Sequence, residues 1–146
     1  LLAHSGYPGM KVLQFGFDAK APSEYVPYNH VPNSVVYTST HDSHTCLQWL
    51  RETDEETLDY ATAYMGLNEE EGLTWGVIRT AMASVSNLAM AQFQDYLELG
   101  EEGRMNCPGI LSDCNWTWRA NDDILEKNLA KKILAMTKLY GRYCGK

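Results

Sequence analysis

A histidine and an aspartate, His41 and Asp42, stand next to each other directly after an apolar, β-branched run, Val35–Thr40, that has the composition of a buried strand. In parallel α/β folds, and above all in (β/α)8 barrels, polar side chains at the carboxyl end of a strand face a ligand. The run would therefore position the pair, and the end of the strand would expose it. An imidazole and a carboxylate placed there could bind a ligand through hydrogen bonds or coordinate a metal ion.

Two alternatives compete with a binding role for this pair. Asp42 or Ser43 could simply cap the amino end of the helix that follows. A metal site would add His44, but both histidines lie at a strand-to-helix junction, and no other cluster of His, Asp or Glu has a recognisable ligand spacing. We therefore expect no metal, and we expect His44 to be a solvated or hydrogen-bonded residue of the helix.

Polar and aromatic residues in the second half of the chain are further candidates for ligand contact. Arg104 and Asn106 lie in a polar loop, of the kind that lines a sugar-binding cleft or forms an ordinary surface turn. Trp116 and Trp118 flank a threonine. Paired aromatic residues can stack on sugar rings, but composition alone favours a loop that is anchored to the core. The sequence holds no Walker, Rossmann or Gly-x-Ser-x-Gly motif.

The composition narrows the class of protein. A chain of 146 residues, 45% of them hydrophobic, can form one modest domain with a core. The formal net charge of −7 argues against binding to nucleic acid or to an anionic membrane. No apolar run is long enough to span a bilayer, and no signal-peptide pattern opens the chain. The cysteines form no CxxC pair and predict reduced thiols in a cytoplasmic protein; they are Cys46, Cys107, Cys114 and Cys144.

The elements that must position these residues alternate between strands and helices. Pattern and turn signals predict first a strand at Lys11–Phe17, a loop with three prolines at Asp18–Asn33 and a strand at Val35–Thr40. Three helices are expected next: one from about Ser43, one through Leu58, Ala61 and Met65, and one with Trp75, Ile78 and Met82 on one stripe. A strand or helix at Ser86–Phe93 and a loop-rich stretch at Gln92–Arg119 then lead to a last helix, with Leu125, Leu129, Ile133, Met136 and Tyr140 at helical spacing. Strands separated by helices imply parallel pairing and an α/β fold, which is either a small α/β domain or the tail of a larger barrel.

Local signals mark the ends of these helices. Thr53-Asp54-Glu55-Glu56 has the pattern of a capping box with its threonine as the N-cap, and Gly66 would end that helix. Asn68-Glu69-Glu70-Glu71 predicts the start of the next helix. Asp122 and Asp123 would open the last helix, and Gly141 would end it. The apolar stripe of that last helix is expected to pack in the core.

Four segments of the chain together resemble the C-terminal part of the 4-α-glucanotransferases, the amylomaltase or disproportionating-enzyme family. They are GYPGMKVLQFGFD (Gly6–Asp18), VPYNHVPNSVVYTSTHDSHT (Val26–Thr45), SVSNLAMAQFQDYLELGEEGRMNCPG (Ser84–Gly109) and NWTWR (Asn115–Arg119). They follow one another in the family's order along nearly the whole chain. The final LYGR (Leu139–Arg142) also resembles the family's end.

The resemblance implies a (β/α)8 barrel enzyme that transfers α-1,4-glucan segments between maltooligosaccharides, starch or glycogen chains with retention, and that needs no cofactor. Asp42 matches the aspartate of the family's T-x-T-H-D motif, which binds the sugar in the bond-breaking subsite and stabilises its transition state. It is therefore the predicted catalytic residue. The predicted substrate-binding residues are His41, Gln14, Phe15, Arg104 and Asn106.

The family's nucleophile and acid/base carboxylates do not map onto this chain. We therefore expect residues 1–146 to be the C-terminal part of the catalytic domain, about the last three βα units of the barrel with a C-terminal helix. Such a piece should be inactive alone. The implied partners are the glucan substrates, with no nucleic acid and no membrane, and the oligomeric state stays open.

The chain departs from the family's pattern beside the predicted catalytic residue. Where the family commonly has T-H-D-N-D-T, Ser43 and His44 follow Asp42, and Cys107 stands where many members have a threonine. Two other classes of function stay open. One is a non-catalytic glucan-binding or assembly module, which the aromatic-rich loops would serve. The other is a metal-dependent hydrolase built on His41, Asp42 and His44.

Overall fold

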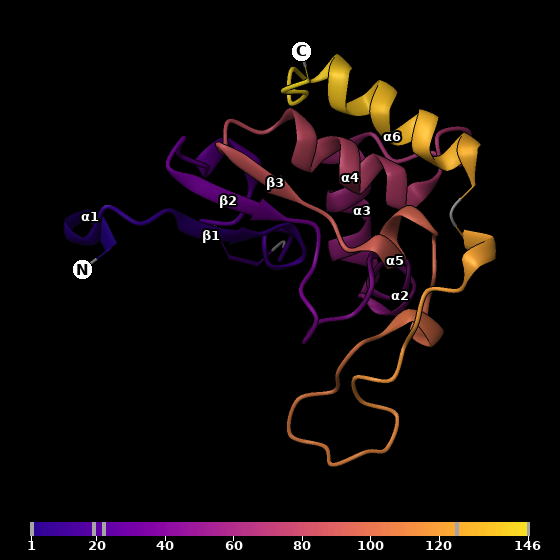
Figure 1. Cartoon of the computed structure of the whole chain (residues 1–146). Coiled ribbons are helices and arrows are strands. Elements are labelled where there is room, and N and C mark those ends of the chain that lie inside the picture. The colour runs from indigo at the N-terminus through magenta and orange to yellow at the C-terminus, as the bar shows by residue number, and fades with distance from the viewer. Residues whose placement is uncertain (1, 19, 22, 125, 146) are drawn as a thin grey trace.

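A three-stranded parallel sheet packs beside the helices in the computed structural model, which describes residues 2–18, 20–21, 23–124 and 126–145 (Figure 1). Strand β1 (Gly9–Val12) pairs with β2 (Ser34–Tyr37), and β2 pairs with β3 (Leu88–Met90). The strand predicted at Val35–Thr40 is thus present but ends earlier, and the ambiguous stretch at Ser86–Phe93 forms a strand. The parallel pairing confirms the predicted α/β class.

The remaining elements are helices and short 3-10 turns. The α-helices are α1 (Leu2–Ser5), α2 (Cys46–Glu52), α3 (Glu55–Met65), α4 (Leu73–Ala83), α5 (Phe93–Tyr96) and α6 (Lys127–Leu139), and the 3-10 turns are η1 (Leu13–Phe15), η2 (Pro27–Asn29), η3 (Glu101–Gly103) and η4 (Asp122–Ile124). Helices α2, α3 and α4 connect β2 to β3. Between α5 and α6 a long loop projects from the body of the molecule (Figure 1).

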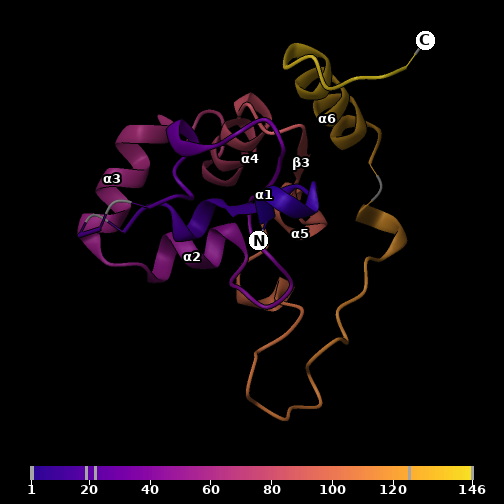
Figure 2. The same ribbon diagram turned by 90° about the vertical axis from the view of Figure 1, so that its left-hand side faces the viewer.

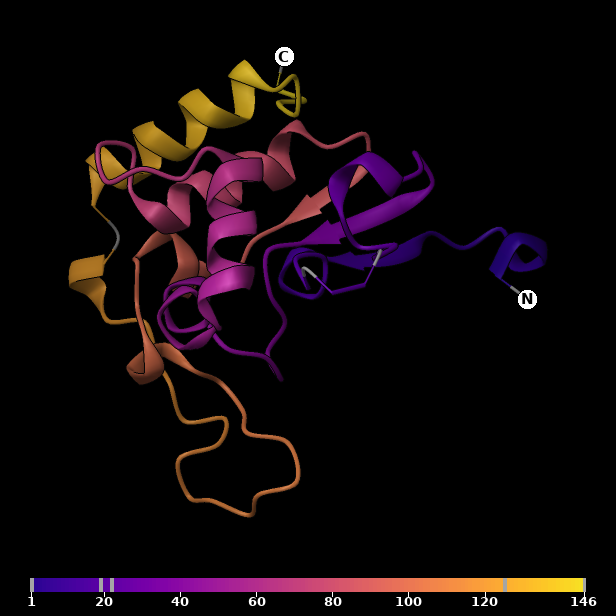
Figure 3. The ribbon, with the colours of Figure 1, turned by 180° about the vertical axis from the view of Figure 1, so that it is seen from behind.

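The two faces of the sheet have different surroundings. Val36 at the centre of β2 is fully buried against the helices, and Figure 2 shows α2 and α3 on one side of the strands, with the same helices seen from behind in Figure 3. Neighbouring strand positions carry side chains on the opposite face. There the exposed fractions are 55% for Met10, 52% for Leu88 and 47% for Met90. The sheet therefore has one covered face and one open apolar face.

The hydrophobic core fills the space between the sheet and helices α2, α3 and α4. Its buried residues are Leu13, Phe17, Val36, Cys46, Trp49, Leu50, Ala61, Met65, Leu67, Val77 and Ala81. Burial of each large aliphatic or aromatic side chain in this core stabilises the folded state by about 1.5–3 kcal/mol. The stripe predicted for the helix at 73–83 is confirmed, because Trp75, Ile78 and Met82 are all buried.

The strand predicted at Lys11–Phe17 is wrong in its second half. β1 ends at Val12, and the chain turns into η1, where Gly16 N donates to Leu13 O at 2.8 Å. The turn lets Leu13 and Phe17 enter the core while Phe15 stays exposed. A straight strand could not do this, because residues 13, 15 and 17 would share one face.

The predicted starts of α3 and α4 are each displaced along the chain. The N-cap of α3 is Asp54, whose side chain accepts from Thr57 N at 3.1 Å, because Thr53 ends α2 by donating its amide to Trp49 O. Gly66, with a φ of 62°, ends α3 as predicted. Asn68 accepts from the amide of Glu71 and forms a turn, so that α4 begins only at Leu73.

Helix α6 lies across α4 at the outside of the molecule (Figure 1). It begins at Lys127, after the separate turn η4, and Gly141 follows its end with a φ of 66°. The prediction that its apolar stripe packs in the core is wrong. The stripe is only half-buried, because one layer of contact with α4 covers one side of it; its described members are Leu129, Ile133, Met136 and Tyr140, and Leu125 lies outside the described residues.

Candidate active site

The candidate site is carried by the loop between β2 and α2. Thr38 continues the sheet by donating its amide to Met90 O at 3.1 Å. The chain then makes a tight turn, in which Ser43 Oγ accepts from Thr40 N at 2.7 Å and Ser43 N donates to Thr40 O at 3.1 Å. This turn points His41 and Asp42 outward, with 57% and 49% of their side chains exposed.

A capping role does not explain the aspartate. The N-cap of α2 is Thr45, whose side chain accepts from Gln48 N at 3.2 Å, so α2 begins at Cys46 instead of about Ser43. Ser43 closes the turn before the helix, and neither Asp42 nor Ser43 caps α2. The carboxylate of Asp42 is therefore available for other partners.

Two predicted substrate-binding residues reach Asp42 from the distant loop after η3. Asn106 Nδ2 donates to Asp42 Oδ1 at 2.7 Å, and Arg104 Nη2 approaches Asp42 O at 3.4 Å. Arg104 Nε also donates to Asn106 O at 3.0 Å, which braces that loop. On the other side, His41 Nε2 lies 3.3 Å from Asp42 Oδ2. Each carboxylate oxygen of Asp42 thus has a nitrogen partner.

Trp116 brings an aromatic surface to the same place. Its ring centroid lies 5.1 Å from that of His41, with the planes tilted by 43°. The backbone of Trp116 is left-handed, with a φ of 64°, and its amide donates to Met105 O at 2.7 Å. The expectation that this loop is anchored to the core is wrong for Trp116, which is half exposed and packs on the candidate site.

A pocket of about 590 Å³ opens at the carboxyl ends of the strands. Phe15 lines it, with its ring edge-on to Tyr25 at a centroid distance of 5.7 Å. The lining consists of the open face of the sheet and the loops that follow β2 and β3; its residues are Met10, Val12, Phe15, Tyr37, Ser39, Thr40, His41, Asp42, Met90, Ala91 and Gln92. An apolar floor with polar groups at one end suits a ligand that has both kinds of surface.

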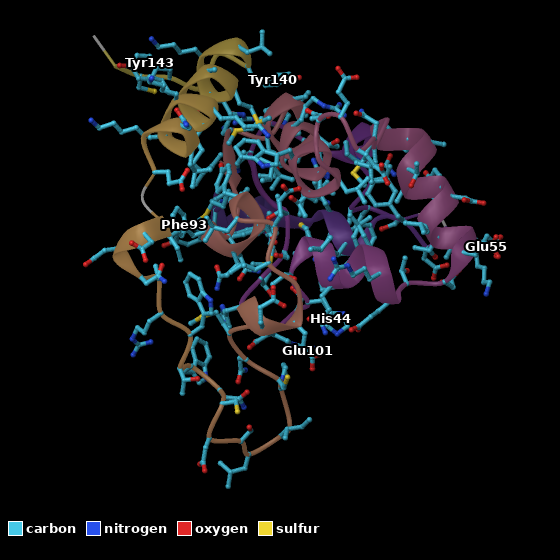
Figure 4. The ribbon with its side chains drawn as sticks, turned by 90° about the vertical axis from the view of Figure 1, so that its right-hand side faces the viewer. His44, Glu55, Phe93, Glu101, Tyr140 and Tyr143 are labelled. Carbon is cyan, nitrogen blue, oxygen red and sulfur yellow. The ribbon has the colours of Figure 1, made fainter. Side chains whose placement is uncertain are left out.

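Gln14 has a different position from the other predicted residues. It is buried, and its Nε2 donates to His44 O at 2.9 Å. It therefore supports the loop from below. Figure 4 shows His44 and Glu101 at the base of the projecting loop, where Thr45 Oγ1 also donates to Gly100 O at 3.1 Å.

Sequence reasoning missed Asp95, a fully buried carboxylate behind the site. It accepts hydrogen bonds from Thr38 Oγ1 at 2.6 Å, from Ser39 Oγ at 3.1 Å and from Cys46 N at 2.8 Å. Burial, with the nearby carboxylate of Asp95, raises the pKa of the Cys46 thiol. The sequence predicted a loop-rich stretch here. The structure instead places Asp95 in the short helix α5 after β3, where its side chain is buried.

A metal-ligand cluster is not formed. Within the described ranges, no group of three or more His, Cys, Asp or Glu side chains lies close enough to hold a metal ion. His44 Nε2 faces Glu52 Oε2 at 3.6 Å, whereas His41 faces Asp42. No disulfide links the four cysteines in the described structure. None of the helices built from the described residues has the length and apolar character needed to cross a bilayer.

Comparisons with known proteins agree on one family. The sequence pattern of the family described as 4-alpha-glucanotransferase matches residues 1–125. A 4-alpha-glucanotransferase of Clostridium butyricum is 44% identical over 139 residues, covering 94% of this chain and 28% of that protein. One from Thermus thermophilus is 38% identical over 140 residues, covering 91% of this chain and 28% of that protein.

A solved structure matches in three dimensions as well. The amylomaltase from Streptococcus agalactiae, determined in complex with acarbose, superposes with a TM-score of 0.91 at 34% identity, covering 97% of this chain and 28% of that one. The chain therefore spans about 28% of the length of the relatives that it matches. It corresponds to one portion of each of them.

Proposed function

The chain belongs to the 4-alpha-glucanotransferase family, and we propose that it forms part of an enzyme that transfers α-1,4-glucan segments between maltooligosaccharides, starch or glycogen chains with retention. The observation that carries this proposal is the placement of Asp42. Its carboxylate stands at the end of a parallel strand, at the edge of the pocket, with His41 and Asn106 each holding one oxygen.

The fold proposed for the whole enzyme is a (β/α)8 barrel, of which residues 1–146 form the C-terminal part, about three βα units and a helix. The open apolar face of the sheet supports this. Met10, Leu88 and Met90 have the character of barrel-interior side chains, which need layers from further strands to cover them. The match to the S. agalactiae amylomaltase supports the same arrangement.

Asp42 is proposed to bind the sugar hydroxyls in the bond-breaking subsite. A carboxylate that accepts from the 2-hydroxyl interacts more strongly as the ring becomes oxocarbenium-like, and only such differential binding accelerates the chemical step. His41 and Asn106 would hold the carboxylate in one orientation. The hydrogen bond from Asn106 and the close approach of His41 each engage one oxygen and leave further lone pairs for the substrate.

Retaining transfer needs two more carboxyl groups, a nucleophile and an acid/base about 5–5.5 Å apart. Among the described residues that line the pocket, Asp42 is the only acidic one. We therefore expect no transfer activity from these 146 residues by themselves. Glucose release or scrambling of maltooligosaccharide lengths by the purified chain would contradict this.

The remaining site residues are proposed to contact the glucan or its binding loops. Phe15 lines the pocket and Trp116 packs against His41, and the exposed aromatic surface of both suits the apolar faces of glucose rings. Arg104 would act mainly by bracing Asn106. Gln14 would act through the backbone of His44. The proposed compartment is the cytoplasm, because exposed free thiols fit a reducing environment.

A chimera tests the role of Asp42. In it, the present chain replaces the segment that it matches in the C. butyricum relative. The unsubstituted chimera should disproportionate maltotriose. Asp42→Asn should lower kcat by roughly 100-fold or more, because removing one group that stabilises the transition state costs about that much. The control Asp59→Asn, an exposed position on α3, should keep full activity. Near-normal activity of a folded Asp42→Asn chimera would refute the proposed role.

A non-catalytic glucan-binding module remains the second candidate, since Tyr28 and Trp116 are both exposed aromatics on loops. Calorimetry of the 146-residue chain with maltoheptaose addresses it. Tight binding, combined with a folded but inactive unsubstituted chimera, would favour this module over the enzyme.

A further inference from the structure

We propose that Asp95 is a positioning residue for the site, because its buried carboxylate holds both ends of the loop that carries His41 and Asp42. This proposal rests on the function proposed above, and it deepens the account of how Asp42 is oriented. Asp95 is not itself a lining residue of the pocket and forms no hydrogen bond with Asp42 in the described structure; it meets the lining through Ser39. Its effect must therefore pass through the backbone of the loop.

The first anchor is at the start of the loop. Thr38 and Ser39 are the two residues that follow β2, and both are buried. Their hydroxyl groups converge on one carboxylate oxygen of Asp95, with Thr38 Oγ1 at 2.6 Å and Ser39 Oγ at 3.1 Å from Oδ2. This fixes the direction in which the chain leaves the sheet.

The second anchor is at the end of the loop. Cys46 is the first residue of α2, and its amide donates to the other oxygen of Asp95, Oδ1, at 2.8 Å. Residues 40–45 thus span the gap between two points that are bound to the same side chain. A displacement of that side chain would shift both ends of the loop together.

Asp95 is itself well suited to be a fixed reference. It belongs to α5, directly after β3, and α5 packs against α4. The same segment gives the loop a third attachment, because Gln92 Nε2 donates to Thr40 O at 3.0 Å and also bonds to Ser39 Oγ. The loop is therefore held from the β3–α5 segment, while His41 and Asp42 extend toward solvent.

The chemistry of the contacts makes Asp95→Asn a sharp perturbation. The backbone amide of Cys46 can only donate, and the two hydroxyls donate to the carboxylate as the structure stands. An asparagine has nearly the same shape, but its NH2 group must face either the amide of Cys46 or the hydroxyl pair. Either the amide of Cys46 loses its acceptor, or the two hydroxyls turn to accept from the NH2 group and lose their charge-assisted hydrogen bonds to the carboxylate. Each change weakens an anchor without changing the volume of the core.

Hydrogen–deuterium exchange of the 146-residue chain tests this directly. Asp95→Asn should speed exchange in the peptide covering residues 39–46 by roughly tenfold or more, as expected for the loss of a buried hydrogen bond. Exchange in α3 and α4 should stay as in the unsubstituted chain, and Asp59→Asn should change neither. Unchanged exchange at 39–46, or an equal increase in every segment, would overturn the proposal.

Kinetics in the chimera separates positioning from simple stability. At a temperature where the protein is fully folded, Asp95→Asn should lower kcat for maltotriose by roughly tenfold, with KM within about threefold, because the lost orientation matters most in the transition state. Equal kcat would overturn the proposal. If Asp95→Asn does not fold, Ser39→Ala removes one donor in its place and should give the same pattern at smaller amplitude. An active Asp42→Asn chimera would refute the role proposed for Asp42. Hydrogen–deuterium exchange tests separately whether Asp95 anchors the loop.

Discussion

Arg142 offers a test of how the C-terminal helix is attached to the rest of the chain. Arg142 follows the end of α6, and its side chain donates to three backbone carbonyls in the last turn of α4 and in the segment between α4 and β3. Nε lies 2.7 Å from Met82 O, Nη2 lies 2.9 Å from Ser84 O, and Nη1 and Nη2 each lie 3.1 Å from Ser86 O. Burial lowers the pKa of Arg142, but the guanidinium stays charged at any working pH.

The expected cost of Arg142→Ala follows from what each carbonyl can do afterwards. Ser86 is almost fully buried, so its carbonyl would lose its partner without gaining water, which costs about 1–3 kcal/mol. Met82 and Ser84 are less completely enclosed than Ser86, so the loss of the hydrogen bonds to their carbonyls is expected to cost about 0.5 kcal/mol each. We therefore expect a loss of about 2–4 kcal/mol in the free energy of unfolding. Arg142→Lys should lose about half as much, since one ammonium cannot serve three acceptors in a fork.

Urea unfolding of the 146-residue chain, followed by circular dichroism and tryptophan fluorescence, measures this. With a slope of about 1–3 kcal/mol per molar urea, Arg142→Ala should move the midpoint down by roughly 1–2 M. Arg119→Ala is the matched control, because Arg119 also donates to backbone carbonyls, but only within its own exposed loop. Its midpoint should hardly move. A midpoint for Arg142→Ala equal to that of the control would refute the reasoning.

Two further predictions use buried titratable groups. Burial lowers the pKa of His30 below its ordinary value of 6.5, so the unfolded chain binds this proton more readily. The stability that neutral His30 contributes is therefore complete above pH 6.5 and is lost as the pH falls through the lower pKa of the folded state. Below pH 6.5, the urea midpoint of the unsubstituted chain should fall more steeply with pH than that of His30→Gln. Parallel curves for the two chains would contradict the prediction. Burial also raises the pKa of Cys46, so an aromatic disulfide reagent should label exposed Cys114 and Cys144 in the native chain, and Cys46 only after unfolding. Labelling of native Cys46 at the rate of Cys114 would contradict its burial.

The sequence was informative about the site where a motif named a residue. The match to the family's T-x-T-H-D and R-M-N patterns placed Asp42 and Asn106 in one site, and the structure joins them with a hydrogen bond although 64 positions separate them. Residue pattern indicated the first two strands and the longer helices, but it left the stretch that forms β3 open between strand and helix. These features are visible in one dimension because they depend on residue type and short-range spacing.

The errors arose where tertiary contacts decide between local options. Thr53 and Asp54 are both good caps, and the choice between them was made by α2, which uses the amide of Thr53. The stripe of α6 has core periodicity but lies at the edge of the structure, where its described residues are only half-buried against α4. Asp95 carries no sequence signal because its three donors come from residues about 50 positions away.

The loop that carries Asp42 can change a side chain at its surface without losing the hydrogen bonds that hold it in place. Its ends are tied down, and His44 contributes its backbone oxygen to Gln14 while its imidazole stays partly open to water. A new side chain at position 44 would alter the exposed surface next to Asp42 without removing the hydrogen bond from Gln14 to the backbone of residue 44. The side chain of residue 44 can therefore change while the hydrogen bonds of Asp42 and of the two loop ends stay the same.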